Sequence, residues 1–102
     1  MTHPSKRKGN TLERDLVNEA REKGLEAKRV PLSGAAEGYP GDVIVHSSWG
    51  SDYCIEAKWR GDGFKQIYGW IQHKNADALV IKADHEEPLC IIPYTKFLDL
   101  LQ

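Results

Sequence analysis

The chain has 102 residues, of which 40% are hydrophobic and 28% are charged, and its formal net charge is −1 at pH 7. This length fits one small globular domain and excludes a multidomain assembly. The longest apolar runs span a few residues, far short of the roughly 20 that a membrane-spanning helix needs, so we expect no membrane span. The polar, basic N-terminus is followed by no apolar segment, which argues against a secretory signal and favours a cytoplasmic protein.

The small net charge hides an alternation of charge along the chain. Residues 1–30 carry eight Lys or Arg against five Asp or Glu, residues 31–57 carry none against four, and residues 58–74 are again basic. Carboxylates flanked by cations are what a metal centre acting on a polyanion needs, although small domains often show such fluctuations. The charge pattern alone is therefore weak support for nucleic-acid binding.

The N-terminal segment, residues 1–9, contains Lys6, Arg7 and Lys8 but no acidic residue and no apolar periodicity. This composition predicts a flexible basic arm. The rest of the chain, residues 10–102, is expected to form a single domain.

The first predicted element of that domain is a helix over residues 11–23. Asn10 and Glu13 have the spacing of a capping box, with Asn in place of Ser or Thr, and Gly24 is a typical C-terminal cap. We therefore expect the helix to start directly after Asn10.

Strands and two further helices follow. Extended, apolar segments predict strands at residues 25–32, 42–46, 53–59, 78–82 and 89–92. Apolar residues at helical spacing predict helices at residues 64–75, through Phe64, Ile67, Tyr68 and Ile71, and at residues 94–101, through Phe97, Leu98 and Leu101. The order is then αβββαββα, which predicts an α/β fold with a mixed central sheet flanked by helices. Cys54 and Cys90 each lie in an apolar run and are expected to be buried thiols.

The third predicted strand carries two opposite charges on one face. Glu56 and Lys58 are two residues apart, and alternate residues of a strand point to the same side. Opposite charges on a half-buried strand are costly unless they serve each other or a ligand. The alternative is a solvated surface ion pair, worth about 0 to 1 kcal/mol.

Asp42 opens the second predicted strand, directly after Pro40 and Gly41. The short connection between the second and third strands predicts an antiparallel hairpin, in which Asp42 and Glu56 lie roughly level. Two carboxylates this close repel each other unless a cation lies between them, and oxygen ligands suit Mg²⁺ or Mn²⁺. A turn carboxylate that accepts nearby N–H groups is the alternative for Asp42.

Glu13 is the third candidate acid. At 100° per residue it falls between Leu12, Leu16 and Val17, inside the apolar arc of the first helix. A capping role in the first helical turn would also account for it. A carboxylate on the face that docks on a sheet needs a partner, and a metal ion would supply one.

Together these features resemble a known family. Glu13, then Ser33 in a Ser-Gly loop, then Gly41-Asp42, then Glu56-Ala57-Lys58, on an αβββαβ core, is similar to the PD-(D/E)XK nuclease superfamily, whose restriction-endonuclease-like fold has a mixed central sheet. The Ser-Gly loop and the helical Glu resemble more narrowly the archaeal-type Holliday-junction resolvases, which phages also encode. The resemblance covers roughly residues 8–95.

The resemblance implies a Mg²⁺-dependent endonuclease, with Mn²⁺ able to substitute, that cuts four-way DNA junctions by paired phosphodiester hydrolysis. It implies that Asp42 and Glu56 bind the metal with help from Glu13. It further implies that Lys58 positions or activates the attacking water and offsets charge on the scissile phosphate, and that Ser33 contacts the phosphate or supports catalysis from its loop.

Other assignments are weaker. Gln66 resembles a polar residue near the metal site of many superfamily members, although an ordinary exposed helix Gln fits equally well. Trp70 lies away from the apolar stripe of its helix, where it would pack on a second subunit or stack on an unpaired base; packing in the core or at its rim is the alternative. The residues expected to hold backbone phosphates are Lys6, Arg7, Lys8, Arg60, Lys65 and Lys74.

The symmetry of a four-way junction, with two scission points, predicts a homodimer. Two other functions share the same motif residues. One is a PD-(D/E)XK nuclease acting in repair, nicking or restriction, and the other is a non-catalytic DNA-binding module of the same fold.

Overall fold

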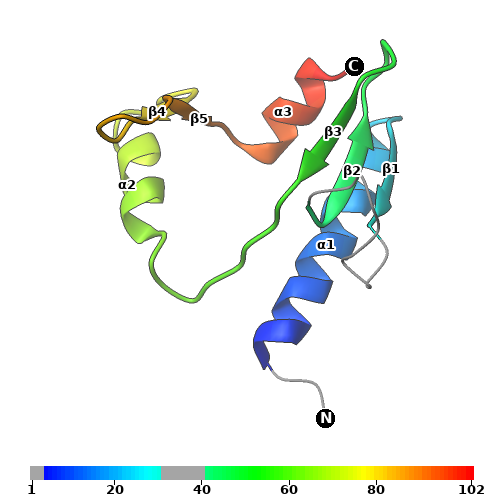
Figure 1. Ribbon diagram of the computed structural model, residues 1–102, viewed down its shortest axis with the longest axis horizontal. Coiled ribbons are helices and arrows are strands. Elements are labelled where there is room, and N and C mark those ends of the chain that lie inside the picture. The colour runs from blue at the N-terminus through cyan, green and yellow to red at the C-terminus, as the bar shows by residue number, and fades with distance from the viewer. Residues whose placement is uncertain (1–3, 31–40) are drawn as a thin grey trace. The chain divides into compact units, whose positions relative to one another are not determined.

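The computed structural model describes residues 4–30 and 41–102, with side chains from Arg7 onward. It divides the chain into two compact units, which we describe separately (Figure 1). The first unit comprises the chain up to Trp59 together with Leu98–Gln102, and the second comprises Arg60–Phe97.

The order of elements is αβββαββα, as predicted, and the fold is a small α/β fold compatible with a restriction-endonuclease-like core. The elements are α1 (Pro4–Glu22), β1 (Glu26–Arg29), β2 (Val43–His46), β3 (Asp52–Ile55), α2 (Lys65–His73), β4 (Leu79–Ile81), β5 (Leu89–Ile91) and α3 (Tyr94–Leu100). The described strands form an antiparallel sheet of order β1-β2-β3 and an antiparallel β4-β5 hairpin, so every described pair is antiparallel where we had expected a mixed sheet.

Helix α1 begins at Pro4, earlier than the sequence pattern predicts. Residues 4–9, which we had assigned to a basic arm, therefore form its first turns, and proline is well suited to that first position because its missing N–H has no partner there. The predicted end of the helix is correct. Gly24 has φ +85°, and the Gly24 and Leu25 N–H groups donate to Arg21 and Ala20 at 2.9 and 3.0 Å, which is a Schellman cap.

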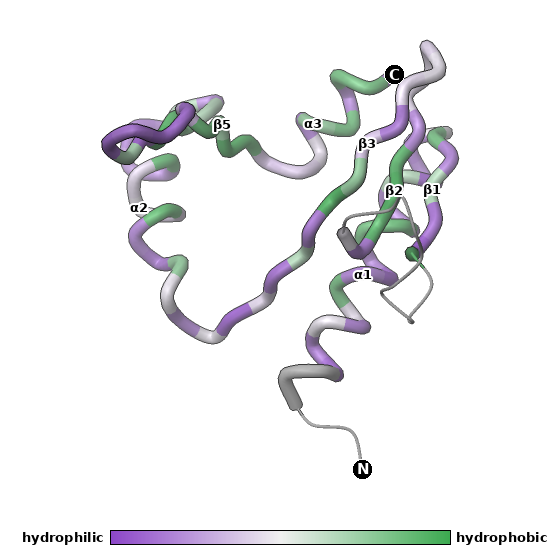
Figure 2. Tube along the Cα trace, in the orientation of Figure 1, coloured by the Kyte–Doolittle hydropathy of each residue, from purple (hydrophilic) through white to green (hydrophobic). Residues whose placement is uncertain are grey.

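The three-stranded sheet is built around β2. Its residues Val43, Ile44 and Val45 are all at most 1% exposed, and Figure 2 shows β2 as an apolar stretch. Strand β3 lies at one edge, where exposed and half-exposed residues alternate. Cys54 lies on this edge strand and is exposed, contrary to our expectation of a buried thiol.

Helix α1 packs against β1 and β2 (Figure 1). Arg21 fixes its C-terminal part by donating from Nε and Nη2 to the Ala27 carbonyl at 3.1 and 2.9 Å. The end of α3 belongs to the same unit, and the Ser48 N–H donates to the Leu101 carbonyl at 2.8 Å. The buried apolar residues of this core are Val17, Ala20, Leu25, Ala27, Val30, Val43, Ile44, Val45, Leu98 and Leu101.

The second unit has no fully buried side chain. The predicted apolar stripe of α2 lines a cavity of about 700 Å³, together with residues 91–94. Lys96 donates to Asp77 at 2.9 Å, and this hydrogen bond, with the charge of Lys96, lowers the pKa of Asp77. Cys90 is exposed, again contrary to expectation. No helix within the described residues of the two units has the length and apolar character needed to cross a lipid bilayer.

Candidate metal centre and DNA-cleavage site

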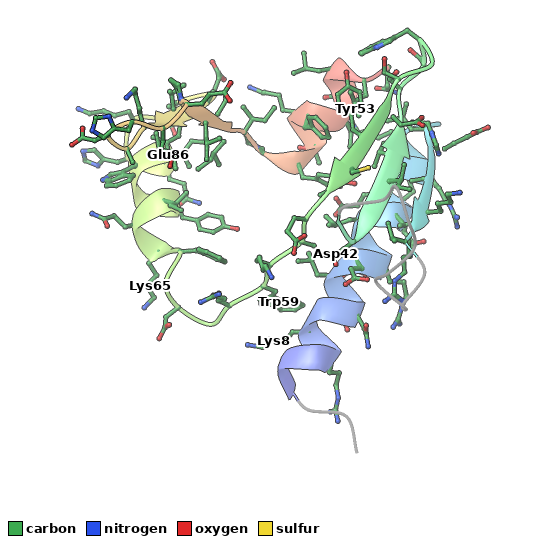
Figure 3. The ribbon with its side chains drawn as sticks, viewed as in Figure 1. Lys8, Asp42, Tyr53, Trp59, Lys65 and Glu86 are labelled. Atoms are coloured by element: carbon green, nitrogen blue, oxygen red, sulfur yellow. The ribbon has the colours of Figure 1, made fainter. Side chains whose placement is uncertain are left out.

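Asp42 lies at the start of β2, where the pairing of β2 with β3 departs from a regular ladder (Figure 3). In the regular ladder Val43 pairs with Ile55, but the Asp42 N–H also donates to the Ile55 carbonyl, at 2.8 Å. Asp42 and Val43 thus both face Ile55, which is the arrangement of a β-bulge. Bulges re-aim side chains next to active sites, and here the bulge ends the pairing of β2 with β3.

The Asp42 carboxylate holds the chain that follows β3. Its Oδ2 accepts the Ala57 N–H at 2.8 Å, while the Asp42 N–H is bonded to Ile55. Glu56 lies between these two contacts, so its backbone is fixed at the position next to Asp42. The sequence predicted that the two carboxylates lie level; the bulge instead sets Asp42 opposite Ile55, with its carboxylate bonded to the residue after Glu56.

Lys58 lies beside Glu56 in a surface ion pair, which is the alternative that the sequence left open for these two residues. Its Nζ is 3.3 Å from the Glu56 Oε1, and both side chains are 61% exposed. Strand β3 ends at Ile55, so these two residues lie just beyond the sheet instead of within it. An exposed, long ion pair of this kind contributes little to stability, which leaves both groups available to a ligand.

Asp42 and Glu56 are the two carboxylates that could hold a hard divalent cation. Within residues 4–30 and 41–102 no cluster of three or more His, Cys, Asp and Glu side chains is arranged to hold a metal. Mg²⁺ is commonly bound through one or two carboxylates, with waters and substrate phosphate oxygens completing its shell. Asp42 uses Oδ2 for the Ala57 N–H, and Glu56 is exposed, so Asp42 Oδ1 and the Glu56 carboxylate are the oxygens that could bind such an ion.

Glu13 has a different partner. Its Oε1 accepts from Nε and Nη2 of Arg29 at 3.1 and 2.9 Å, and the same Nη2 donates to Asn10 Oδ1 at 3.0 Å. The predicted capping box is therefore wrong. Residues three apart lie on one face of a helix, and Asn10 and Glu13, in the middle of α1, use that face to hold β1.

Breaking this contact is expected to destabilise the first unit. Glu13 and Arg29 are only 18% and 33% exposed, so we expect a double-mutant cycle of Glu13→Gln and Arg29→Met to give a coupling of about 1–2 kcal/mol in urea unfolding. The matched control is the Lys23–Asp99 pair, which is 37% and 56% exposed and for which we expect less than about 1 kcal/mol. Strictly additive effects at Glu13 and Arg29 would contradict the structural role.

The remaining predicted site residues are distributed over both units. Ser33 lies outside the described residues. Gln66 is exposed on α2 and lines a cavity of about 710 Å³ in the second unit, near Trp70, which is 50% exposed. Of the predicted phosphate-binding residues, Lys6, Arg7 and Lys8 lie in the first turns of α1, and Arg60, Lys65 and Lys74 are exposed in the second unit.

Comparison with models of known protein families identifies the family of this chain. The model of a family described as archaeal Holliday junction resolvase (Hjc) matches residues 4–89. The chain belongs to this family. The match confirms the resemblance inferred from the motif and the element order, and with it Holliday-junction resolvase nuclease activity. The Hjc resolvases are metal-dependent nucleases that bind branched DNA. No solved structure matches the chain.

Sequence reasoning missed three features of this resolvase. Gly41 was given no structural role, yet its φ is +131° and a Cβ there would lie 3.0 Å from the Ile55 carbonyl oxygen. Arg29 was not recognised as the partner of Glu13. Trp59, which directly follows Lys58, was given no role, although the Gly before Asp42 and the Trp after Lys58 were both visible in the sequence.

Proposed function

We propose that this protein is a Mg²⁺-dependent endonuclease that resolves four-way DNA junctions by paired phosphodiester hydrolysis, with Mn²⁺ able to replace Mg²⁺. Asp42 and Glu56 hold the metal, and Lys58 acts beside it. The observation that carries this proposal is the bulge at Asp42, whose N–H and carboxylate bind the two neighbours of Glu56 in sequence.

The two carboxylate oxygens of Asp42 would have different roles. Oδ2 keeps the Ala57 N–H at 2.8 Å and so holds the Glu56 backbone in place, while Oδ1 is directed to the metal. A bound Mg²⁺ supplies a nucleophilic water and neutralises charge on the phosphate oxygens. Because Asp42 bridges the two strands, the site is preorganised by backbone hydrogen bonds and does not depend on a long side chain.

Lys58 is proposed to contact Glu56 in the free protein and the scissile phosphate when DNA is bound. In the free protein its Nζ is 3.3 Å from Glu56 Oε1, which keeps the ammonium group close to the metal-binding carboxylate. With Glu56 engaged by a divalent cation, the Lys58 ammonium group would be free to orient the attacking water and to offset negative charge on the scissile phosphate. Because both side chains are exposed, separating the Lys58–Glu56 ion pair would cost little free energy.

Glu13 is engaged by Arg29 through one of its two carboxylate oxygens. Oε1 of Glu13 is held by Arg29, so we propose that Glu13 supports the site chiefly from Oε2 and through the position of β1. The Val30 N–H donates to the Asp42 carbonyl at 2.9 Å, so the strand that carries Arg29 also positions Asp42. Ser33 and Gln66 are proposed to contact the phosphate and to support the metal site, respectively.

The basic residues of α1 are proposed to bind backbone phosphates. Replacing Lys6, Arg7 and Lys8 together with Gln should lower the slope of log K against log salt by about 2 to 3, because each lost phosphate contact removes about 0.9 from the slope. Gln keeps the helical propensity of the segment. A single Lys23→Gln variant, at the other end of α1, serves as the control, and an unchanged slope in the triple variant would refute the contact.

A homodimer is proposed because a symmetric junction has two scission points and each chain carries one Asp42-Glu56 site. Sedimentation of the protein with one junction should give a complex of two chains.

The test of the proposed function is cleavage of a four-way junction, a fork and a linear duplex, each with Mg²⁺ and with EDTA. We expect paired nicks on the junction that require the metal. Equal cutting of all three substrates would instead indicate a less selective nuclease, and binding without any scission would indicate a non-catalytic module. Either of these results overturns the proposal.

A further inference from the structure

Trp59 directly follows Lys58, and its large indole ring is 48% exposed. The segment that carries it is anchored two residues earlier by the bond between Asp42 Oδ2 and the Ala57 N–H. Consecutive Cα atoms are about 3.8 Å apart, so the backbone of Trp59 lies immediately beside that of Lys58. An exposed aromatic ring is thus fixed next to the group that would reach the scissile phosphate.

Lys8 supplies a positive charge at the same place. Its Nζ lies 5.8 Å from the centroid of the Trp59 ring, and Figure 3 shows the two side chains next to each other. A cation at this distance from an aromatic face is attracted to the ring and restricts its orientation. Lys8 of α1 and Trp59 of the segment after β3 together present an ammonium group and an aromatic surface, which is the combination that binds single-stranded or unstacked nucleic acid.

Branched DNA differs from duplex DNA in the stacking of its bases. Within a duplex both faces of each base pair are covered by neighbours, so an exposed aromatic side chain finds nothing to stack on. At the branch point of a junction, the end pair of an arm that does not stack on another arm has one uncovered face. Stacking on an aromatic side chain does not depend on sequence, because every base has a π face.

We propose that Trp59 stacks on an uncovered nucleobase at the branch point and that Lys8 binds the phosphate beside it. Trp59 then recognises the junction by its structure and places the scissile phosphate against Lys58. This inference rests on the proposed function and names the feature of the substrate that the site selects.

The chain offers a matched control in Trp49. It is similarly exposed, at 55%, and belongs to the same unit. It lies in the turn that joins β2 to β3, whereas Trp59 follows the opposite end of the hairpin. The paired residues between the two ends span about 10 Å of strand, so Trp49 does not share the environment of the bulge.

The test is the binding of a four-way junction and of a linear duplex with the same arm sequences, in EDTA so that no cleavage occurs. We expect Trp59→Ala to weaken junction binding about tenfold and duplex binding less than twofold. Trp59→Phe should restore most of the loss, because it keeps an aromatic face, and Trp49→Ala should bind both DNAs like the unmodified protein. Lys8→Met should weaken binding to both DNAs to the same extent.

A second readout uses 2-aminopurine at the branch point. Its fluorescence should fall when the unmodified protein binds and should fall less with Trp59→Ala. Equal weakening of both DNAs by Trp59→Ala, or no weakening, would overturn the stacking role while leaving junction cleavage by the unmodified protein intact. If instead the unmodified protein does not prefer the junction and does not cut it, the proposed function itself fails.

Discussion

Replacing Asp42 with Asn is expected to lower the rate of junction cleavage by at least about 100-fold while leaving junction binding nearly unchanged. Loss of a residue that merely supports a metal ligand typically costs 10- to 100-fold, so loss of a ligand itself should cost at least the upper end of that range. Asn keeps an oxygen that can accept the Ala57 N–H, so the bulge and the position of Glu56 should persist. The lost charge, and not a lost fold, would then explain the effect.

Single-turnover cleavage and an affinity measurement in EDTA separate the two effects of the Asp42→Asn change. Asp15→Asn is the matched control, since Asp15 is an exposed acid on α1 and takes no part in the site. Glu56→Gln should behave like Asp42→Asn. Cleavage at the normal rate by Asp42→Asn would remove this residue from the metal site, and a parallel loss of binding would place it in the phosphate contact instead.

Substituting Gly41 with Ala should both destabilise the first unit and impair cleavage. The backbone of Gly41 has φ +131°, a conformation that L side chains rarely adopt, and an added Cβ would lie 3.0 Å from the Ile55 carbonyl oxygen. We expect a loss of about 1–3 kcal/mol in the free energy of unfolding. The same Ile55 oxygen accepts the Asp42 N–H, so any shift that relieves the clash also displaces Asp42.

Displacement of a catalytic group by about 1 Å can cost 100-fold in rate, so cleavage by Gly41→Ala should fall at least tenfold even where the protein is fully folded. Gly9→Ala is the control. Gly9 lies within α1 with open space around a Cβ, and Ala there should raise the free energy of unfolding by about 0.5–1 kcal/mol. Normal stability and activity of Gly41→Ala would show that the bulge does not require glycine.

The element order could be predicted from the sequence because it depends on local patterns. The helical spacing of Ile67 and Ile71, the apolar run of β2 and the glycine after α1 each specify an element or a boundary with little help from the rest of the chain. The antiparallel β2–β3 hairpin could be predicted as well, since a short connection sets the register of its strands, but the bulge that places Asp42 opposite Ile55 could not.

The features that could not be predicted depend on residues far apart in the chain. Asn10 and Glu13 have the spacing of a capping box, but they bind Arg29, which is 16 residues beyond Glu13, and local sequence contains no signal for that partner. The exposure of Cys54 follows from the place of β3 at the edge of its sheet, which depends on the pairing of all three strands. The need for glycine at position 41 arises from the Ile55 carbonyl, 14 residues away.

The most direct test of the central claim is the binding of Mn²⁺ by the protein alone, followed by the decrease of the free Mn²⁺ signal in electron paramagnetic resonance. We predict that the unmodified protein binds one or more Mn²⁺ ions and that the Asp42→Asn, Glu56→Gln double variant binds at least about tenfold more weakly, while Asp15→Asn is unchanged. Equal Mn²⁺ affinity in the double variant and the unmodified protein would contradict the assignment of these two carboxylates to the metal.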